Sequence, residues 1–579
     1  MKSIKYISLL LGMGAVAFTS CSDFLDTVPD ERTEIDSPDK VVSLLVSAYP
    51  ESNPAWIGEL SSDNIIDNQA PHLPSSPNDK QILSHYNYSH YTLWDNQLFR
   101  FEPASTASYG NNDSPGQLWA SYYSSIATVN HALQAIDNIE KADSSTSELK
   151  AAKGEALLLR AYDHFMLVNI FSKAYKDAEA SKNDVGVPYV TEPENVVSKQ
   201  YDRGNVADVY AKIGKDLEEG LQNISDVNFK TAPKYHFNTN AAHAFAARYY
   251  LYTHQWQKVI DHANEVLGTD SASVQNMLMD LSSFKDCSSA DDYATAWQHP
   301  NRKNNLLLID TYSLLTRRVF GYRYSCAGPA ARAALMINTS NPLWRGYICP
   351  AQMLVSGQLF ASSSHDYGFI STKIYEKFEY TDKIAGIGYP HIIYRAFTAN
   401  SLLLDRAEAK IMLGRYEDAA QDLRWYWNCE LNTLSADDYK AYITGGYTKF
   451  MTNSVFKDYY SDPENVNCFA NWDFTQRMSS SYVIPAEATP YMNCLNDFRR
   501  TETAFEGYRF FDLKRWGVDL THVVGVEQEQ VQSNYDDDNR AVEVPWETLS
   551  AGLESSRQTV TPSKPDASFN LSTLVVKTK

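Results

Sequence analysis

The sequence predicts a mainly α-helical protein, built from helical hairpins that carry long irregular loops and a little β structure. Three observations lead to this fold class. Apolar residues recur at helical spacing over long stretches, and two segments resemble each other in the manner of a helical repeat. Of the 579 residues, 44% are hydrophobic and 21% are charged, a balance that favours a packed core over a disordered chain.

Three stretches show the helical spacing most clearly, at 117–139, 148–171 and 206–224. In each of them apolar side chains return every three or four positions, which places them on one face of a helix. Polar and charged residues occupy the positions between. We therefore expect three long helices, each burying one face against its neighbours.

Two later segments, 246–256 and 406–416, align with each other at a constant offset of 160 residues. Small alanines match in the alignment, and Trp256 falls opposite Tyr416. A second apolar helical stretch follows each segment. Small residues allow two helices to approach closely, and an aromatic side chain after the turn fixes their packing. This pattern is typical of tetratricopeptide-like hairpins.

Three regions break the helical pattern, at 52–116, 268–397 and 432–492. They are rich in Asn, Ser, Gly, Pro and aromatic residues, and we expect some β structure within 306–397. Long loops on a rigid scaffold often carry function. We interpret 41–579 as one helical domain into which these loops are inserted.

The amino terminus has the features of a bacterial lipoprotein. Lysines precede a short apolar stretch at 7–18, and small residues then lead to Cys21. The apolar stretch is too short to span a membrane, so we interpret 1–20 as a signal peptide and 21–40 as a lipidated tether. The alternative is ordinary secretion, with Cys21 an incidental thiol. No later stretch reaches the 18 apolar residues of a membrane-spanning helix.

The net charge of −20 argues against a nucleic-acid partner, which needs clustered Lys and Arg. The sequence contains no H-E-x-x-H, G-x-x-x-x-G-K-[ST], G-x-S-x-G or G-x-G-x-x-G motif, and no C-x-x-C spacing. We therefore expect no metal, no cofactor and no catalysis, although the number of carboxylates alone still allows a glycosidase pair.

The sequence does not determine how its six later cysteines pair. One option is a disulfide between Cys326 and Cys349. The six residues are Cys287, Cys326, Cys349, Cys429, Cys468 and Cys494.

Several motifs, taken in order, resemble the SusD/RagB-like family of outer-membrane nutrient-binding lipoproteins of Bacteroidetes. The amino-terminal piece is Cys21-Ser22-Asp23-Phe24-Leu25-Asp26. The helical pieces are Gly154-Glu155-Ala156-Leu157-Leu158-Leu159-Arg160-Ala161-Tyr162 and Leu404-Asp405-Arg406-Ala407-Glu408-Ala409. The most specific piece is Arg499-Arg500-Thr501-Glu502 followed by Phe505-Glu506-Gly507-Tyr508-Arg509-Phe510-Phe511-Asp512-Leu513-Lys514-Arg515-Trp516. Order and spacing together make the resemblance specific.

The resemblance implies a SusD-like α-helical fold and a lipoprotein on the outer face of the outer membrane, anchored through Cys21. It implies a protein that captures oligosaccharides, or peptides in some members, and passes them to a SusC-like TonB-dependent transporter. The signature itself is interpreted as structural. Arg509, Asp512 and Arg515 lie three residues apart, so they share a helix face and can form ion pairs.

A sugar-binding site needs aromatic side chains that stack on C–H faces, together with amide or charged groups that bond hydroxyls. Two loop regions have this composition, and the resemblance places ligand contacts in corresponding regions. The candidate ligand residues are Trp94, Asn96, Arg100, Tyr322, Tyr324, Asn341, Trp344 and Arg345. For Trp94, packing within the local core is an equal alternative. Tryptophans on the predicted helices, Trp119 among them, are expected to belong to the core.

Four functions remain open from the sequence. The first is capture of an oligosaccharide at the cell surface, and the second is capture of a peptide on the same fold. The third is a surface enzyme, for which no set of residues argues. The fourth is a structural component of a surface complex.

Overall fold

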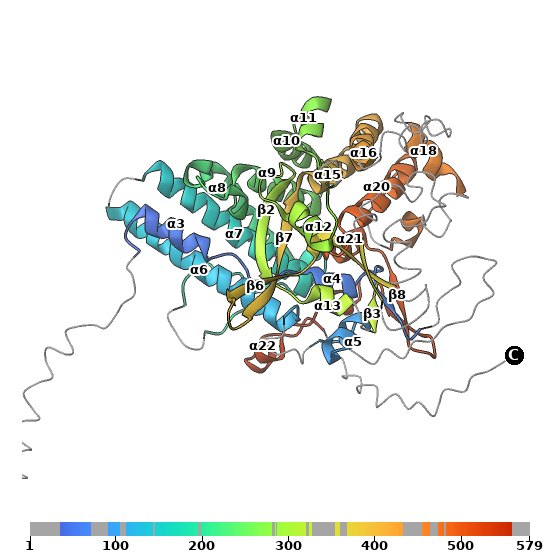
Figure 1. Ribbon diagram of the computed structural model, residues 1–579, viewed down its shortest axis with the longest axis horizontal. Helices are drawn as coiled ribbons and strands as arrows, with labels where there is room; N and C mark the ends of the chain where they lie inside the picture. Colours follow the sequence, from blue (N-terminus) through green and yellow to red (C-terminus); the bar gives the residue numbers. More distant parts are fainter. Residues whose placement is uncertain are drawn as a thin grey trace, which may run out of the picture.

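The computed structural model describes residues 35–70, 91–104, 112–142, 145–194, 199–280, 284, 286–319, 323–326, 354–358, 367–431, 454–463, 473–479 and 482–557. Helices dominate this part of the chain (Figure 1). The helices of its first half are α3 (Pro38–Val46), α4 (Ala55–Leu60), α5 (Leu93–Phe99), α6 (Pro115–Ala142), α7 (Ser147–Phe171), α8 (Val206–Asn223), α9 (Thr239–Tyr252) and α10 (Trp256–Leu267). Those of its second half are α11 (Ser271–Met277), α12 (Ala290–Gln298), α13 (Leu315–Val319), α15 (Ala399–Met412), α16 (Tyr416–Leu431), α18 (Ser454–Ser461), α20 (Thr489–Glu502), α21 (Tyr508–Trp516) and α22 (Trp546–Ser550).

The long helices pack side by side in chain order, from α6 through α7, α8, α9 and α10 to α15 and α16 (Figure 1). The three long helices expected from apolar spacing are α6, α7 and α8, and the observed ends lie within a few residues of the expected ones. Side-chain caps fix two of the starts. Thr146 accepts from the Leu149 amide at α7, and Asn205 accepts from the Asp208 amide at α8.

The two similar segments form two helical hairpins, α9–α10 and α15–α16. Corresponding boundaries keep the offset of 160, because α10 begins at Trp256 and α16 begins at Tyr416. The turns correspond as well. His254 has a φ of 59° and Gly414 a φ of 72°, so both occupy the left-handed region that ends the first helix. The hairpins are confirmed, while their kinship with tetratricopeptide repeats stays a prediction.

Antiparallel strands occupy small sheets beside the helices (Figure 1). The strands are β1 (Ile66–Asp67), β2 (Asn305–Tyr312), β3 (Tyr324–Ser325), β4 (Leu354–Gln358), β5 (Tyr367–Ser371), β6 (Lys377–Asp382), β7 (Ile387–Thr398), β8 (Leu520–Val524) and β9 (Glu529–Ser533). A three-stranded sheet has the order β2-β7-β6, and the other pairs are β1-β3, β4-β5 and β8-β9. The β structure expected within 306–397 is therefore present, whereas the β8–β9 hairpin was not expected.

A buried ionic network joins α15, α20 and α21. The Arg499 guanidinium donates to both carboxylate oxygens of Asp512 at 2.9 and 3.0 Å, and it also bonds Asp405. Arg515 donates to Asp512 at 2.9 Å and bonds both oxygens of Glu408. The expected pairing of Asp512 with Arg515 is thus confirmed. These contacts tie the 404–409 motif to the signature at 499–516, although 94 positions separate Asp405 from Arg499.

Arg509 departs from the expectation that it pairs within the signature helix. Its guanidinium donates to the two oxygens of Asp63 at 2.8 and 3.0 Å. Asp63 comes within reach of Arg509 because the backbone of α4 at Gly58 lies directly against the backbone at Gly507. A Cβ on Gly58 would lie 2.3 Å from the Gly507 carbonyl oxygen, and Gly507 has a φ of 82°. Glycine at both positions therefore lets the signature loop sit directly on α4.

No described helix is long and apolar enough to cross a bilayer. In the same residues, no group of three or more His, Cys, Asp or Glu side chains is arranged to hold a metal ion. Cys326 is a buried free thiol, and Cys287 and Cys494 are also free. Cys349, suggested above as one partner of Cys326, lies outside the described residues together with Cys468.

Candidate functional site

The pairing of β1 with β3 brings part of the expected loop site together. Asp67 lies opposite Tyr324 in this pair, and Tyr324 reaches α5. Its hydroxyl donates to the Asn96 carboxamide oxygen, and its ring stacks on Phe99 with ring centroids 4.5 Å apart. Asn96 and Tyr324, more than two hundred positions apart in the chain, are therefore direct neighbours.

The other described candidates, Trp94 and Arg100, contact protein groups more than solvent. Trp94 is only 3% exposed, and the Arg318 guanidinium lies over its ring at 4.6 Å. Arg100 is held by Glu529 at 2.7 Å and by Glu102 at 3.1 Å. The burial of Trp94 agrees with the packing alternative. Of the remaining candidates, Tyr322, Asn341, Trp344 and Arg345 lie outside the described residues, so their part in a site stays a prediction.

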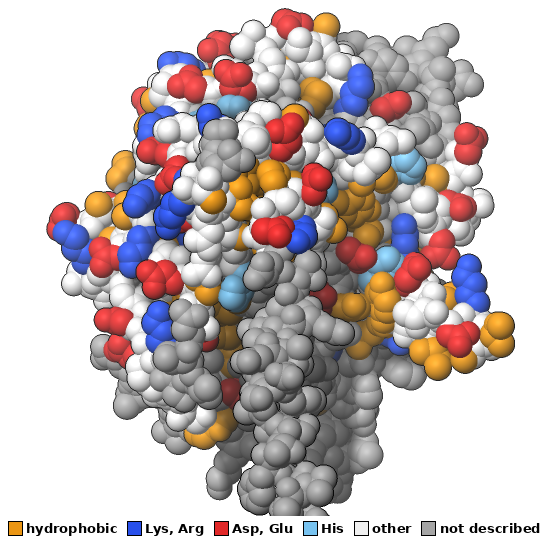
Figure 2. Space-filling view, turned by 90° about the vertical axis from the view of Figure 1, so that its left-hand side faces the viewer, with side chains coloured by type: hydrophobic (Ala, Val, Ile, Leu, Met, Phe, Trp, Pro, Cys, Tyr) orange, Lys and Arg blue, Asp and Glu red, His pale blue; other side chains and the backbone are white. Residues whose placement is uncertain are grey.

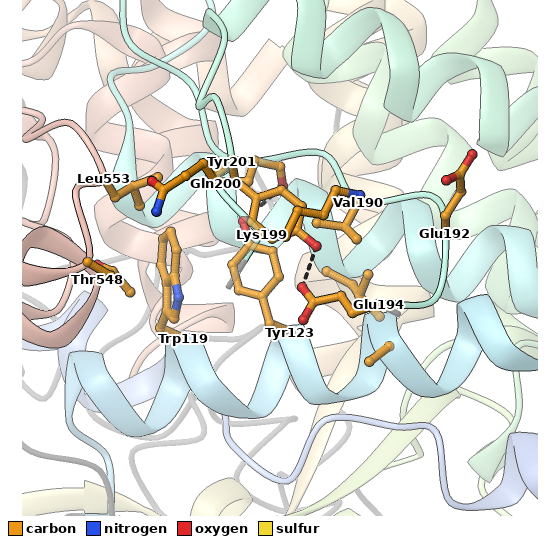
Figure 3. Close-up of a pocket in the computed structure, with 14 residues that line it drawn as sticks. Trp119, Tyr123, Val190, Glu192, Glu194, Lys199, Gln200, Tyr201, Thr548 and Leu553 are labelled. Carbon is orange, nitrogen blue, oxygen red and sulfur yellow. Dashed lines mark hydrogen bonds between the residues drawn. The ribbon is translucent and has the colours of Figure 1, made fainter. Parts of the chain in front are cut away.

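A cavity of about 340 Å³ opens beside the first turns of α6 and is called the aromatic cavity below (Figure 3). Trp119 and Tyr123 rise from α6 to form its floor, one helical turn apart. Tyr201 lies above them, and Leu553 closes one end. The size falls within the range of small-molecule binding sites, and most of the lining is apolar.

The aromatic floor is supported from behind. The rings of Trp119 and Tyr123 lie 4.8 Å apart at an angle of 47°. Phe171, at the end of α7, packs edge-on against Trp119 with centroids 4.9 Å apart. This packing fixes the orientation of both rings. They offer an apolar surface of defined shape without having to reorganise for a ligand.

Polar groups form the rim of the aromatic cavity. The Tyr201 hydroxyl donates to Glu194, and the Lys199 ammonium lies 5.1 Å from the Tyr201 ring centroid. Burial and the neighbouring Glu194 carboxylate both raise the pKa of Tyr201, so this hydroxyl stays a neutral hydrogen-bonding group at physiological pH. Gln200 adds a carboxamide beside them. The rim therefore contains a carboxylate, an amide, an ammonium and a phenol.

The wall formed by residues 188–194 is fixed through its backbone. The Tyr123 hydroxyl donates to the Pro188 carbonyl at 2.9 Å, and the Asn130 side chain donates to the Val190 carbonyl at 3.1 Å. The Val190 amide donates to Nε2 of the buried His164 at 3.1 Å. Because neighbouring helices hold each of these backbone groups, the wall is preorganised for a ligand.

The sequence pattern did not predict this cavity. It placed Trp119 in the core, and the side chain is indeed only 6% exposed, yet it also lines the cavity. One signal was present, because Trp119 and Tyr123 share a helix face with Ile126. Nothing in the sequence indicated that residues 548–553 would close the same space. Chemically, rings beside a polar rim can stack on and hydrogen-bond a neutral polar ligand.

The fold is a helical scaffold that carries an aromatic cavity, and comparison with known proteins shows what it is similar to. Residues 23–251 match the SusD-like family described as starch-binding and associating with the outer membrane. The match covers less than half of the 579 residues, and it shows that this part of the chain is similar to the SusD-like family. The comparison with curated proteins returned no match.

Solved structures share the fold along almost the whole chain. A SusD superfamily protein from Bacteroides vulgatus is 17% identical, with a TM-score of 0.55, over 92% of this chain and 99% of its own. One from Bacteroides fragilis is 15% identical, with a TM-score of 0.56, over 90% and 99%. A SusD-like carbohydrate binding protein from Bacteroides vulgatus is 16% identical, with a TM-score of 0.51, over 91% and 99%.

Proposed function

We propose that this protein binds an oligosaccharide at the bacterial surface and delivers it to a TonB-dependent outer-membrane transporter. The aromatic cavity carries the binding part of the proposal. Its stacked floor suits the apolar face of a sugar ring, and its rim offers donors and acceptors for hydroxyl groups. The family description as starch-binding and the carbohydrate-binding relative of the same fold support this ligand class.

Tyr201→Ala is expected to weaken glycan binding by roughly tenfold to thirtyfold, because it removes one stacking ring and the hydroxyl that orients Glu194. Titration calorimetry of residues 22–579 against a panel of neutral glycans measures the loss. Tyr380→Ala is the matched control, since Tyr380 is a tyrosine 50% exposed on β6, away from the cavity. The control should bind as the unchanged protein does.

Three results would contradict this proposal. If the unchanged protein binds no glycan of the panel, glycan capture is wrong. If it binds only a peptide mixture, the peptide alternative replaces the oligosaccharide. If it binds glycans but Tyr201→Ala has no effect, the aromatic cavity is not the site, and loss of binding in Trp94→Ala or Trp344→Ala would place the site in the loops predicted from sequence.

The surface location and the delivery step form the second part of the proposal. Residues 1–20 serve as signal peptide, 21–40 as tether, and acyl chains on Cys21 hold the domain 41–579 at the outer membrane. The family description includes association with the outer membrane. A surface protein that captures a glycan too large for passive entry needs a partner that imports it, and a SusC-like transporter meets that need.

Cys21→Ser is expected to move most of the protein from the membrane fraction to the soluble fraction, because stable anchoring by lipid needs the acyl chains that this thiol carries. Fractionation of cells followed by immunoblotting measures the shift. Ser22→Ala, one residue further on, is the control and should remain membrane-bound. If Cys21→Ser stays in the membrane fraction, the protein is not held by a lipid at this residue.

A further inference from the structure

A second hollow continues the aromatic cavity along α6. It has a volume of about 680 Å³, lies between α6, α7 and α8, and is called the polar groove below. The residues of α6 that line the aromatic cavity are Trp119, Tyr123, Ile126 and Ala127. Those that line the polar groove are Asn130, Leu133, Gln134, Asp137, Asn138 and Lys141. Single residues and adjacent pairs recur every three or four positions along this list, so one face of α6 floors both hollows.

The wall segment 188–194 also borders both hollows. Pro188, Val190 and Glu194 line the aromatic cavity, whereas the residues between them, Tyr189 and Thr191, line the polar groove. This alternation is that of an extended backbone, whose successive side chains point to opposite sides. Glu192 lines both hollows, and Figure 3 shows it at the end of the aromatic cavity opposite Leu553. The two hollows therefore meet at Glu192.

The chemistry changes along this face. The aromatic half offers rings, while the polar half offers the exposed carboxamides of Gln134 and Asn138. The buried Arg160 of the groove is neutralised by two hydrogen bonds to Asp216, at 2.7 and 2.9 Å. The other charged side chains of the groove have both signs, with Lys141, Lys153, Lys212 and Lys215 near Asp137, Glu192 and Glu219. Positive and negative side chains are also mixed over the face of the molecule seen in Figure 2. Neither half selects an anion or a cation, but both can bond hydroxyls.

We propose that the aromatic cavity and the polar groove are the two halves of one trough for an elongated, uncharged oligosaccharide. The inference rests on the proposed function and adds the length and charge of the ligand to it. From Trp119 to Lys141 the shared face of α6 extends about 33 Å. One unit stacks on Trp119 and Tyr123, the chain passes Glu192, and further units bond the carboxamides of the groove. A single sugar unit fills only the aromatic half.

The test uses the full-length protein and two neutral glycan series, maltooligosaccharides and laminarioligosaccharides, from disaccharide to heptasaccharide. Affinity should rise with chain length in the series that binds. The double variant Gln134→Ala/Asn138→Ala should weaken binding of the heptasaccharide by about tenfold, through loss of hydrogen bonds, and leave the disaccharide unchanged. Tyr201→Ala should weaken both lengths. His131→Ala, exposed on α6 outside the trough, is the control for the helix.

The outcomes separate this inference from the proposed function. If all lengths bind equally and the groove variant binds as the unchanged protein does, the ligand occupies the aromatic cavity alone and the extended trough is wrong, while glycan capture stands. If a sulfated or uronate-containing glycan of equal length binds much more tightly, the uncharged class is wrong. If no glycan binds at any length, both proposals fail.

Discussion

Replacing Arg499 with alanine is expected to lower the free energy of unfolding by about 3–5 kcal/mol, the typical effect of removing one partner from a buried ion pair. Arg499 is 2% exposed and holds the carboxylates of Asp512 and Asp405, which are also buried. Without the guanidinium, two carboxylates remain in the protein interior with fewer compensating charges. The cost arises from leaving these charges unpaired, because a buried pair contributes little net stability by itself.

Chemical denaturation followed by circular dichroism measures this change. Lys258→Ala is the control, since Lys258 also forms an ion pair, with Glu218 at 3.6 Å, but both side chains are exposed, by 48% and 56%. Its removal should cost at most about 1 kcal/mol, as is usual for exposed pairs. If the two variants lose equal stability, the signature residues do not anchor α20 and α21 as described. A large difference would support a scaffold role for the most specific family motif.

Acid is expected to destabilise the protein in part through His164, by about 3 kcal/mol between pH 7 and pH 4. Burial lowers the pKa of His164 from 6.5 to about 3. The unfolded chain therefore takes up a proton below pH 6.5, whereas the folded protein does not until about pH 3. Because the folded pKa is the lower one, this stability is present above pH 6.5 and falls as the pH falls toward 3.

The hydrogen bonds of His164 explain why the neutral ring is preferred. The Val190 amide donates to Nε2, so the ring proton is on Nδ1 and donates to the Arg160 carbonyl at 2.8 Å. A second proton on Nε2 would face the Val190 amide, which is itself a donor. Acid thus acts on the segment that forms one wall of the aromatic cavity.

To test this prediction, the free energy of unfolding is measured as a function of pH for the unchanged protein and for His164→Asn. Asparagine does not titrate, and its amide can still donate to the Arg160 carbonyl. The variant is expected to be less stable at pH 7, yet its stability should fall less steeply toward pH 4. Parallel curves for the two proteins would show that His164 does not contribute to acid sensitivity, whatever the stability at neutral pH.

The sequence by itself determined the helical elements and the resemblance to the SusD-like family. Apolar spacing is a local property, so it placed α6, α7 and α8 within a few residues of their observed ends. The offset of 160 predicted the two hairpins, because a repeated pattern of small and aromatic residues repeats the local geometry. The signature placed Asp512 and Arg515 on one helix face, where they do pair. These results need only near neighbours in the chain.

Only the tertiary structure decided what the loop and helix side chains contact. Arg509 was expected to pair within its own helix, and it pairs with Asp63, more than four hundred positions away. Trp119 was assigned to the core, and packing of 188–194, 199–201 and 548–553 around it leaves an open cavity. A cavity is the space that remains when distant segments meet, so no local pattern encodes it. Its position depends on the packing of the whole chain.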